Sequence, residues 1–111
     1  MIEPVDRLRA TRDDALALAG RLLTDMEAVA AAREGANVDD EHDPEGSTIA
    51  YERSQLDAVR RSALERAADA EAALARLDAG TFGRCERCSA RIGEARLEAR
   101  PSARLCIDCA S

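Results

Sequence analysis

The sequence predicts a mainly α-helical chain, in which an antiparallel two-helix coiled-coil hairpin is followed by a small module built on four cysteines. Three observations support this fold class. Apolar residues make up 46% of the 111 residues but aromatic residues only 2%, so the large side chains of a thick globular core are scarce. Ala, Leu, Glu and Arg recur at helical spacing before the cysteines, which is typical of long paired helices. All four cysteines lie in the last third of the chain.

The first helix is expected from about residue 4 to residue 33. Pro4 suits the first position of a helix, where an N–H group would have no partner within the helix. Apolar residues then recur at spacings of three, four and seven, while charged residues fill the other faces. These residues are Leu8, Ala15, Leu18, Leu22, Met26 and Val29. The pattern indicates one amphipathic helix.

The second helix is expected over residues 49–79, after a connection at about 34–48. In that connection Asp43-Pro44 offers a helix start, and Ser47 is an alternative cap. An apolar stripe follows at Ile49, Leu56, Val59, Ala63, Ala67, Ala70, Leu74 and Leu77. Gly80 stands where a C-terminal glycine cap belongs. Because both stripes repeat close to every seven residues, residues 1–79 are expected to form one coiled-coil hairpin.

The four cysteines form two Cys-x-x-Cys pairs. Cys85 and Cys88 are separated from Cys106 and Cys109 by seventeen residues. Two pairs at this separation are typical of a tetrahedral zinc site, because each turn presents two sulfur atoms on one side, at about 2.3 Å from the metal. Residues 80–111 are therefore predicted to be a four-cysteine zinc finger that binds one structural Zn²⁺.

Other roles for the cysteines are less favoured. Neither a signal peptide nor an apolar run of about 20 residues is present, so a cytoplasmic location without membrane contact is expected. Thiols stay reduced there, which disfavours two disulfides. A redox-active pair would need only one of the two motifs. A catalytic zinc would need an open coordination position, and no nucleophile–base set is evident, so the chain is not expected to be an enzyme. His42 is interpreted as a solvated residue of the connection.

Charge is unevenly distributed along the chain. The net charge is −6; residues 1–79 contain 10 Arg against 18 acidic residues, and residues 80–111 contain 6 Arg against 4. Four thiolates on Zn²⁺ add a net −2, so the finger is about neutral. Direct, sequence-specific DNA binding is not expected, because it requires a basic face. The finger arginines either compensate the thiolate charge or dock an acidic partner: Arg84, Arg87, Arg91, Arg96, Arg100 and Arg104.

Three segments of the finger resemble the zinc finger of the DksA/TraR family. They are GTFGRCERC at 80–88, RLEARP at 96–101 and LCIDC at 105–109, and the helical hairpin before them is also similar. The resemblance implies direct binding to the β and β′ subunits of bacterial RNA polymerase rather than to promoter DNA. Members of the family insert the hairpin into the polymerase secondary channel, where acidic residues at the tip alter initiation, often together with the alarmone ppGpp.

The resemblance makes the acidic connection a candidate functional tip. Its candidate residues are Asp39, Asp40, Glu41 and Asp43. The member that gives the family its name has an Asp-x-x-Asp-x-Ala pattern there. In this chain Asp43 keeps the first acid, while Gly46 and Thr48 stand at the other two places. A solvated acidic turn without a function is the alternative interpretation.

Direct binding of ppGpp is not expected. Members that respond to ppGpp have basic residues at the positions of Asp69 and Ala110, which are not basic in this chain. Of the basic positions compared, only the one at Arg100 is matched. The resemblance thus implies a zinc-binding transcription regulator that binds RNA polymerase. The alternatives are a protein-interaction adaptor with another partner and, less favoured, a nucleic-acid binder.

Overall fold

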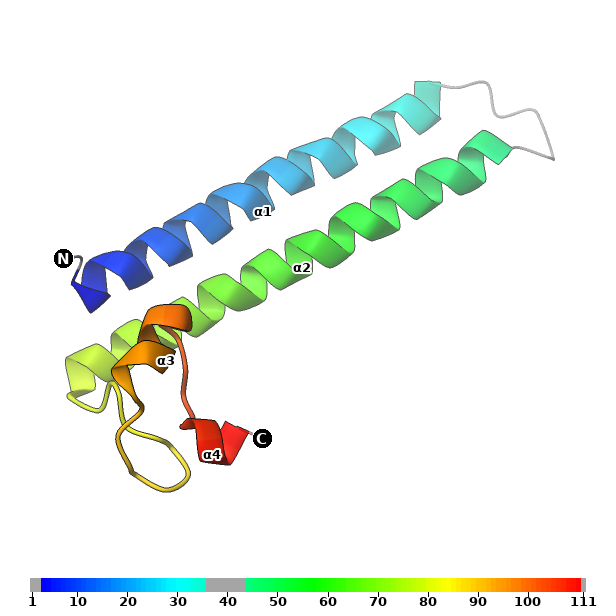
Figure 1. Cartoon of the computed structure of the whole chain (residues 1–111). Helices are drawn as coiled ribbons and strands as arrows, with labels where there is room; N and C mark the ends of the chain where they lie inside the picture. The colour runs from blue at the N-terminus through cyan, green and yellow to red at the C-terminus, as the bar shows by residue number, and fades with distance from the viewer. Residues whose placement is uncertain (1–2, 36–43, 111) are drawn as a thin grey trace. The chain divides into compact units, whose positions relative to one another are not determined.

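A computed structural model of the chain describes residues 3–35 and 44–110. It contains the long helices α1 (Pro4–Gly35) and α2 (Pro44–Ala79) and the short helices α3 (Glu94–Ala99) and α4 (Ile107–Ala110) (Figure 1). Within the described residues no strand is present, and the one β-bridge joins Arg84 and Arg91. The mainly α-helical class with paired long helices is confirmed. No helix in the described ranges is long and apolar enough to span a membrane.

The chain divides into two compact units. One, the finger unit, contains Met1–Asp14 and Arg66–Ser111; the other, the arm unit, contains Ala15–Glu65. In each unit a stretch of α1 lies beside a stretch of α2 that runs in the opposite direction (Figure 1). The functional site described below lies wholly within the finger unit.

Alanine dominates the buried seam between the helices. The buried residues are Ala15, Ala19, Leu22 and Ala63 in the arm unit, and Leu8, Ala67, Ala70 and Ala73 in the finger unit. Small side chains allow two helix backbones to approach closely, so a narrow seam can be dry without aromatic residues. The predicted stripes are confirmed in outline. The prediction for the second stripe is wrong at Val59, which is 47% exposed.

The second helix begins earlier than the sequence prediction. It starts at Pro44 rather than near residue 49, and α1 runs on to Gly35. Proline fits the first turn of a helix, and Pro44 is the first residue of α2. Ser47 consequently lies within the first turn of α2 rather than before it. The predicted cap residue Asp43 lies outside the described residues.

The end of α2 is closed by a glycine cap, as predicted. Gly80 has a φ of 78°, in the left-handed region that glycine adopts without a Cβ clash. Its N–H donates to the Leu77 carbonyl at 3.2 Å, and the Thr81 N–H donates to the Arg76 carbonyl at 2.9 Å. This pair of bonds is the Schellman arrangement, which satisfies the last carbonyls of the helix and turns the chain into the finger.

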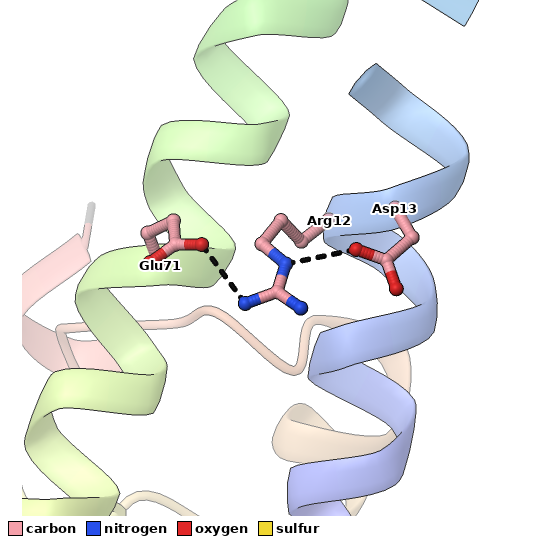
Figure 2. Close-up of polar contacts among 3 residues, drawn as sticks. All are labelled: Arg12, Asp13 and Glu71. Atoms are coloured by element: carbon pink, nitrogen blue, oxygen red, sulfur yellow. Dashed lines mark hydrogen bonds and ion pairs between the residues drawn. The ribbon is translucent and has the colours of Figure 1, made fainter. Parts of the chain in front are cut away.

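One ion-pair cluster joins α1 to α2 in the finger unit. Figure 2 shows Arg12 between two carboxylates: its Nε lies 3.0 Å from Asp13 and its Nη1 lies 3.0 Å from Glu71 of α2. The hydrogen bond to Asp13, and then the one to Glu71, raises the pKa of Arg12 above its ordinary value. Both carboxylates are largely exposed, so this cluster contributes less to stability than the buried seam does.

Candidate metal centre

The finger has its own small core, in which two of the cysteines take part. Cys85, Ile92 and Cys106 are buried together. Leu97, Ala103, Leu105 and Cys109 pack against them and are partly buried. So few apolar side chains cannot offset the conformational entropy of about 30 ordered residues, which is the reason small modules of this kind depend on a metal.

The first cysteine pair lies in a tight turn that the backbone holds. The Ser89 N–H donates to the Cys85 carbonyl at 2.9 Å, and the Cys85 N–H donates to the Ala90 carbonyl at 2.8 Å. Ser89 adopts a φ of 64°, which is uncommon for a residue with a Cβ. The turn therefore points two sulfur atoms to one side.

The second cysteine pair lies at the short helix α4: Cys106 directly precedes this helix and Cys109 lies within it. The Cys109 N–H donates to the Cys106 carbonyl at 3.1 Å. Arg96 of α3 fixes the residue before Cys106, since its Nε donates to the Leu105 carbonyl at 2.9 Å. The Glu86 N–H donates to the Arg104 carbonyl at 2.9 Å and joins the two cysteine turns directly.

Arg76 attaches the finger to the last turn of α2. Its side chain is only 13% exposed; Nη2 donates to the Ser102 carbonyl at 3.3 Å, and Nη1 lies 3.9 Å from the Glu86 carboxylate. A largely buried guanidinium with two partners fixes orientation better than a surface pair does, because its planar fork constrains both contacts. The cysteine turns are thus held against a rigid helix end.

The four sulfur atoms lie where a tetrahedral metal ion requires them. All four lie within 4.8 Å of one another, and the Cys88 and Cys106 sulfurs are 3.7 Å apart. A zinc–sulfur bond of about 2.3 Å implies sulfur–sulfur edges of about 3.8 Å in a tetrahedron. None of the four cysteines is in a disulfide. The donor set therefore fits one Zn²⁺, and four thiolates fill its coordination sphere, as expected for a structural ion.

The thiols differ in acidity. Backbone N–H groups, that of Cys106 first and that of Cys88 second, lower the pKa of Cys85 to about 6. Thiol contacts, first with Cys106 and then with Cys85, raise the pKa of Cys109 to about 12. The pKa of Cys88 is also raised: the Ala90 N–H lowers it, but contacts with Cys85 and Cys106 outweigh that effect. The Cys85 sulfur is thus ready to bind metal at neutral pH. The Cys88 and Cys109 thiols keep their protons until metal displaces them.

Zinc binding is expected to release protons and to weaken as the pH falls. At pH 7 Cys88 and Cys109 must lose protons to bind, whereas Cys85, with a pKa of about 6, is mostly deprotonated already. Below about pH 6 Cys85 must also lose its proton, so the affinity should fall more steeply there. Calorimetry in two buffers of different ionisation enthalpy measures the proton release. A zinc affinity that is constant between about pH 5 and about pH 8 would contradict this view.

The finger unit also contains a cleft. Its volume is about 380 Å³, and it is lined by Thr11, Arg66, Asp69, Arg100, Pro101, Ser102 and Ala103. The structure thus brings together Asp69 and Arg100, which the sequence analysis linked to ppGpp. Ala110 is not among the lining residues and lies in α4. Arg66 was missed; its place three residues before Asp69, on the same face of α2, was the available signal.

The remaining candidate residues lie outside the described residues. These are the tip candidates Asp39, Asp40, Glu41 and Asp43, together with His42. Thr48, which stands at one of the altered tip positions, lies in the second turn of α2.

Comparison with known proteins agrees with the cysteine geometry. Residues 80–111 match the model of the prokaryotic dksA/traR C4-type zinc finger. Over these residues the finger is similar to the C4-type zinc fingers of the DksA/TraR family. Its four clustered cysteines accordingly hold one structural Zn²⁺. For residues 80–111, the predicted resemblance to this zinc-finger family and the predicted zinc site are confirmed.

The relatives that match this region are named as transcription factors. The chain is 59% identical over 39 residues to the RNA polymerase-binding transcription factor DksA of Haemophilus influenzae, and 54% identical over 39 residues to that of Escherichia coli K12. These matches cover 35% of this chain and 27% and 26% of the two relatives, so the chain matches about a quarter of their length.

The fold of the whole chain has a solved counterpart. Transcription factor DksA2 from Pseudomonas aeruginosa superposes with a TM-score of 0.80, over 96% of this chain and 77% of that one, at 20% identity. At this identity the likeness establishes a shared fold, with a long helical pair before the DksA/TraR finger.

Proposed function

We propose that this chain is a transcription regulator that binds bacterial RNA polymerase directly, rather than promoter DNA. The observation that carries the proposal is the identity of 54–59% between its finger and those of proteins named RNA polymerase-binding transcription factors. The common fold with a DksA2 transcription factor supports it, because that fold includes the hairpin as well as the finger. The site of action is then the bacterial cytoplasm, where the polymerase works.

The proposed route is the secondary channel, with contacts to the β and β′ subunits. This route rests on the resemblance, in which members of the family insert a helical hairpin into that channel. The acidic candidates Asp39, Asp40, Glu41 and Asp43 then form the acting tip. Carboxylates near a polymerase catalytic centre can bind basic loops or perturb bound Mg²⁺. The zinc site has a structural role, and no catalytic activity is proposed for it.

An adaptor that uses the same hairpin on another protein is the second candidate. The Ala-rich seam pairs the two helices whichever protein the hairpin contacts, so the hairpin alone does not favour polymerase. A nucleic-acid binder is third, because residues 1–79 carry 10 Arg against 18 acidic residues and would repel a phosphate backbone.

Replacing Asp43 by Asn is expected to separate effect from binding. The change removes one negative charge from the proposed tip and keeps the side-chain size and much of the capping ability, since Asn caps nearly as well as Asp. Polymerase affinity should stay within about threefold of the parent, which is under about 0.7 kcal/mol. The transcript yield in a purified initiation assay should nevertheless change.

Asp25→Asn is the matched control for the tip variant. Asp25 is an exposed acid of α1 in the described part of the arm unit, and the substitution removes the same charge. The control should alter neither binding nor yield. Unchanged yield with Asp43→Asn would favour a solvated turn without a function. A loss of binding with intact helicity would mean that the tip anchors the complex and does not only act in it.

ppGpp is expected to have little affinity for the isolated chain. Asp69 places a carboxylate in the cleft that Arg66 and Arg100 also line, and a carboxylate opposes a phosphate ligand. Calorimetry with ppGpp should give no micromolar binding to the parent chain. A micromolar site that disappears on Arg100→Gln would contradict this expectation. Repeating the titration with the polymerase complex tests whether the partner completes a basic pocket.

A further inference from the structure

The finger carries exposed arginines that form no ion pair with any residue the structure describes. Arg84, Arg87 and Arg91 lie on and around the first cysteine turn, and Arg104 precedes the second. Ile107, at the start of α4, is 72% exposed, more than any other large apolar side chain in the described ranges. These five residues are called the arginine face below.

The placement of Arg84 and Arg91 works against the finger on its own. The two residues are paired across an antiparallel β-bridge. Like charges directly opposite each other destabilise such a pair, and no described carboxylate forms an ion pair with either arginine to compensate. A residue choice that costs the isolated finger stability is explained if an anionic surface covers it in a complex.

Two of these arginines are held in place by the finger itself. Arg84 Nη1 donates to the Ser89 carbonyl, and Arg87 Nη1 donates to the Cys109 carbonyl, each at 3.4 Å. A guanidinium has five N–H donors, so each retains several for a carboxylate. Side chains held before binding lose less conformational entropy in a complex. Arg87 also ties the first cysteine turn to α4, the helix that carries Ile107.

Compensation of thiolate charge explains these contacts less well. The hydrogen bonds of Arg84 and Arg87 go to carbonyl oxygens, and neither reaches a sulfur atom. The apolar Ile107 has no part in charge compensation. It does fit a protein interface, where arginine and apolar side chains are enriched together. A nucleic acid is a poorer occupant, because nucleic-acid interfaces are more polar than protein interfaces and would leave Ile107 without an apolar partner.

We propose that the arginine face docks an acidic protein surface that offers an apolar contact to Ile107. Under the function proposed above, on which this step rests, that surface belongs to RNA polymerase. The finger then contributes affinity through its own surface, in addition to presenting the hairpin.

The test compares two charge-matched double variants of the zinc-loaded full chain. Arg84→Gln/Arg91→Gln changes the arginine face, and Arg21→Gln/Arg53→Gln changes exposed arginines of the arm unit by the same net charge. Binding to purified core polymerase is measured over a salt series, and zinc affinity by chelator competition. The finger double should bind about tenfold more weakly and with a smaller salt dependence, while the arm double stays within about threefold. Zinc affinity of the finger double should equal that of the parent chain. Ile107→Ser, which leaves every charge in place, should also weaken binding.

The outcomes separate the two proposals. No binding by the parent chain overturns the proposed function. Equal binding by the parent and the finger double overturns the arginine face alone. Lost zinc affinity in the finger double with normal polymerase binding also overturns it, because the arginines then serve the thiolates. Sub-micromolar binding of duplex DNA at physiological salt that the finger double loses overturns the choice of a protein partner.

Discussion

Cys106→Ala is expected to abolish stoichiometric zinc binding and to unfold the finger. Three thiolates would remain, and the lost sulfur lies 3.7 Å from that of Cys88, in the buried centre of the finger core. Structural zinc sites contribute about 10–16 kcal/mol of apparent binding free energy at pH 7, which the small core around Ile92 cannot replace. Metal analysis should fall from one zinc per chain to well below one. Methyl NMR signals of Ile92, Leu97 and Leu105 should lose their dispersion.

Ser89→Gly is the matched control for this loss. It lies in the same turn and is not a ligand, and glycine adopts its left-handed φ of 64° more readily than serine does. Zinc content should stay at one per chain. Full zinc content in Cys106→Ala, or two disulfides in the parent chain, would contradict the metal site. Much of the helical circular dichroism should survive the loss of zinc, because the seam in the arm unit involves no cysteine.

Leu8→Ala is expected to destabilise the helical pair by about 2–5 kcal/mol. Leu8 has no exposed surface, and it is the largest fully buried side chain among the described residues. It packs with Ala70 and Ala73 of α2, and Leu74, Leu77 and Phe82 pack against this cluster. The small alanines around it cannot move to fill the space that truncation leaves. Urea unfolding of the zinc-loaded chain, followed by circular dichroism, measures the change.

Leu16→Ala is the control for the core variant. Leu16 lies on the same helix but is 48% exposed, so its truncation should cost under about 1 kcal/mol. Equal losses from the two substitutions would mean that the cluster around Leu8 is not the core of the finger unit.

Those parts of the fold that depend on local spacing could be predicted from the sequence. A tetrahedral site needs two sulfurs from each turn, and the Cys85–Cys88 and Cys106–Cys109 pairs supply them at a spacing that is visible in the chain. The glycine cap after α2 at Gly80 was equally local, because few residue types other than glycine adopt a positive φ without cost. The order of hairpin and finger follows directly from the positions of the apolar stripes and of the cysteines along the chain.

Features that depend on the exact rotation of the helices were harder to predict. Val59 matched the apolar spacing but is exposed, whereas Ala19 and Ala73 are buried and were not included. In an Ala-rich chain the contrast between buried and exposed faces is weak, so several seams fit one sequence. Arg66 was missed because its importance depends on a loop, Arg100–Ala103, that folds beside it. The contacts of Arg76 with the finger could not be read from spacing for the same reason.

The central claim is direct binding to bacterial RNA polymerase, and capture by the zinc-loaded full chain tests it most directly. The tagged chain is mixed with bacterial lysate and, separately, with purified core polymerase, and bound proteins are identified by mass spectrometry. The proposal predicts that the β and β′ subunits dominate the captured lysate proteins, and that purified core enzyme binds without any other protein. Capture of a different protein in the absence of β and β′, with no binding of the purified core enzyme, would contradict it and favour the adaptor.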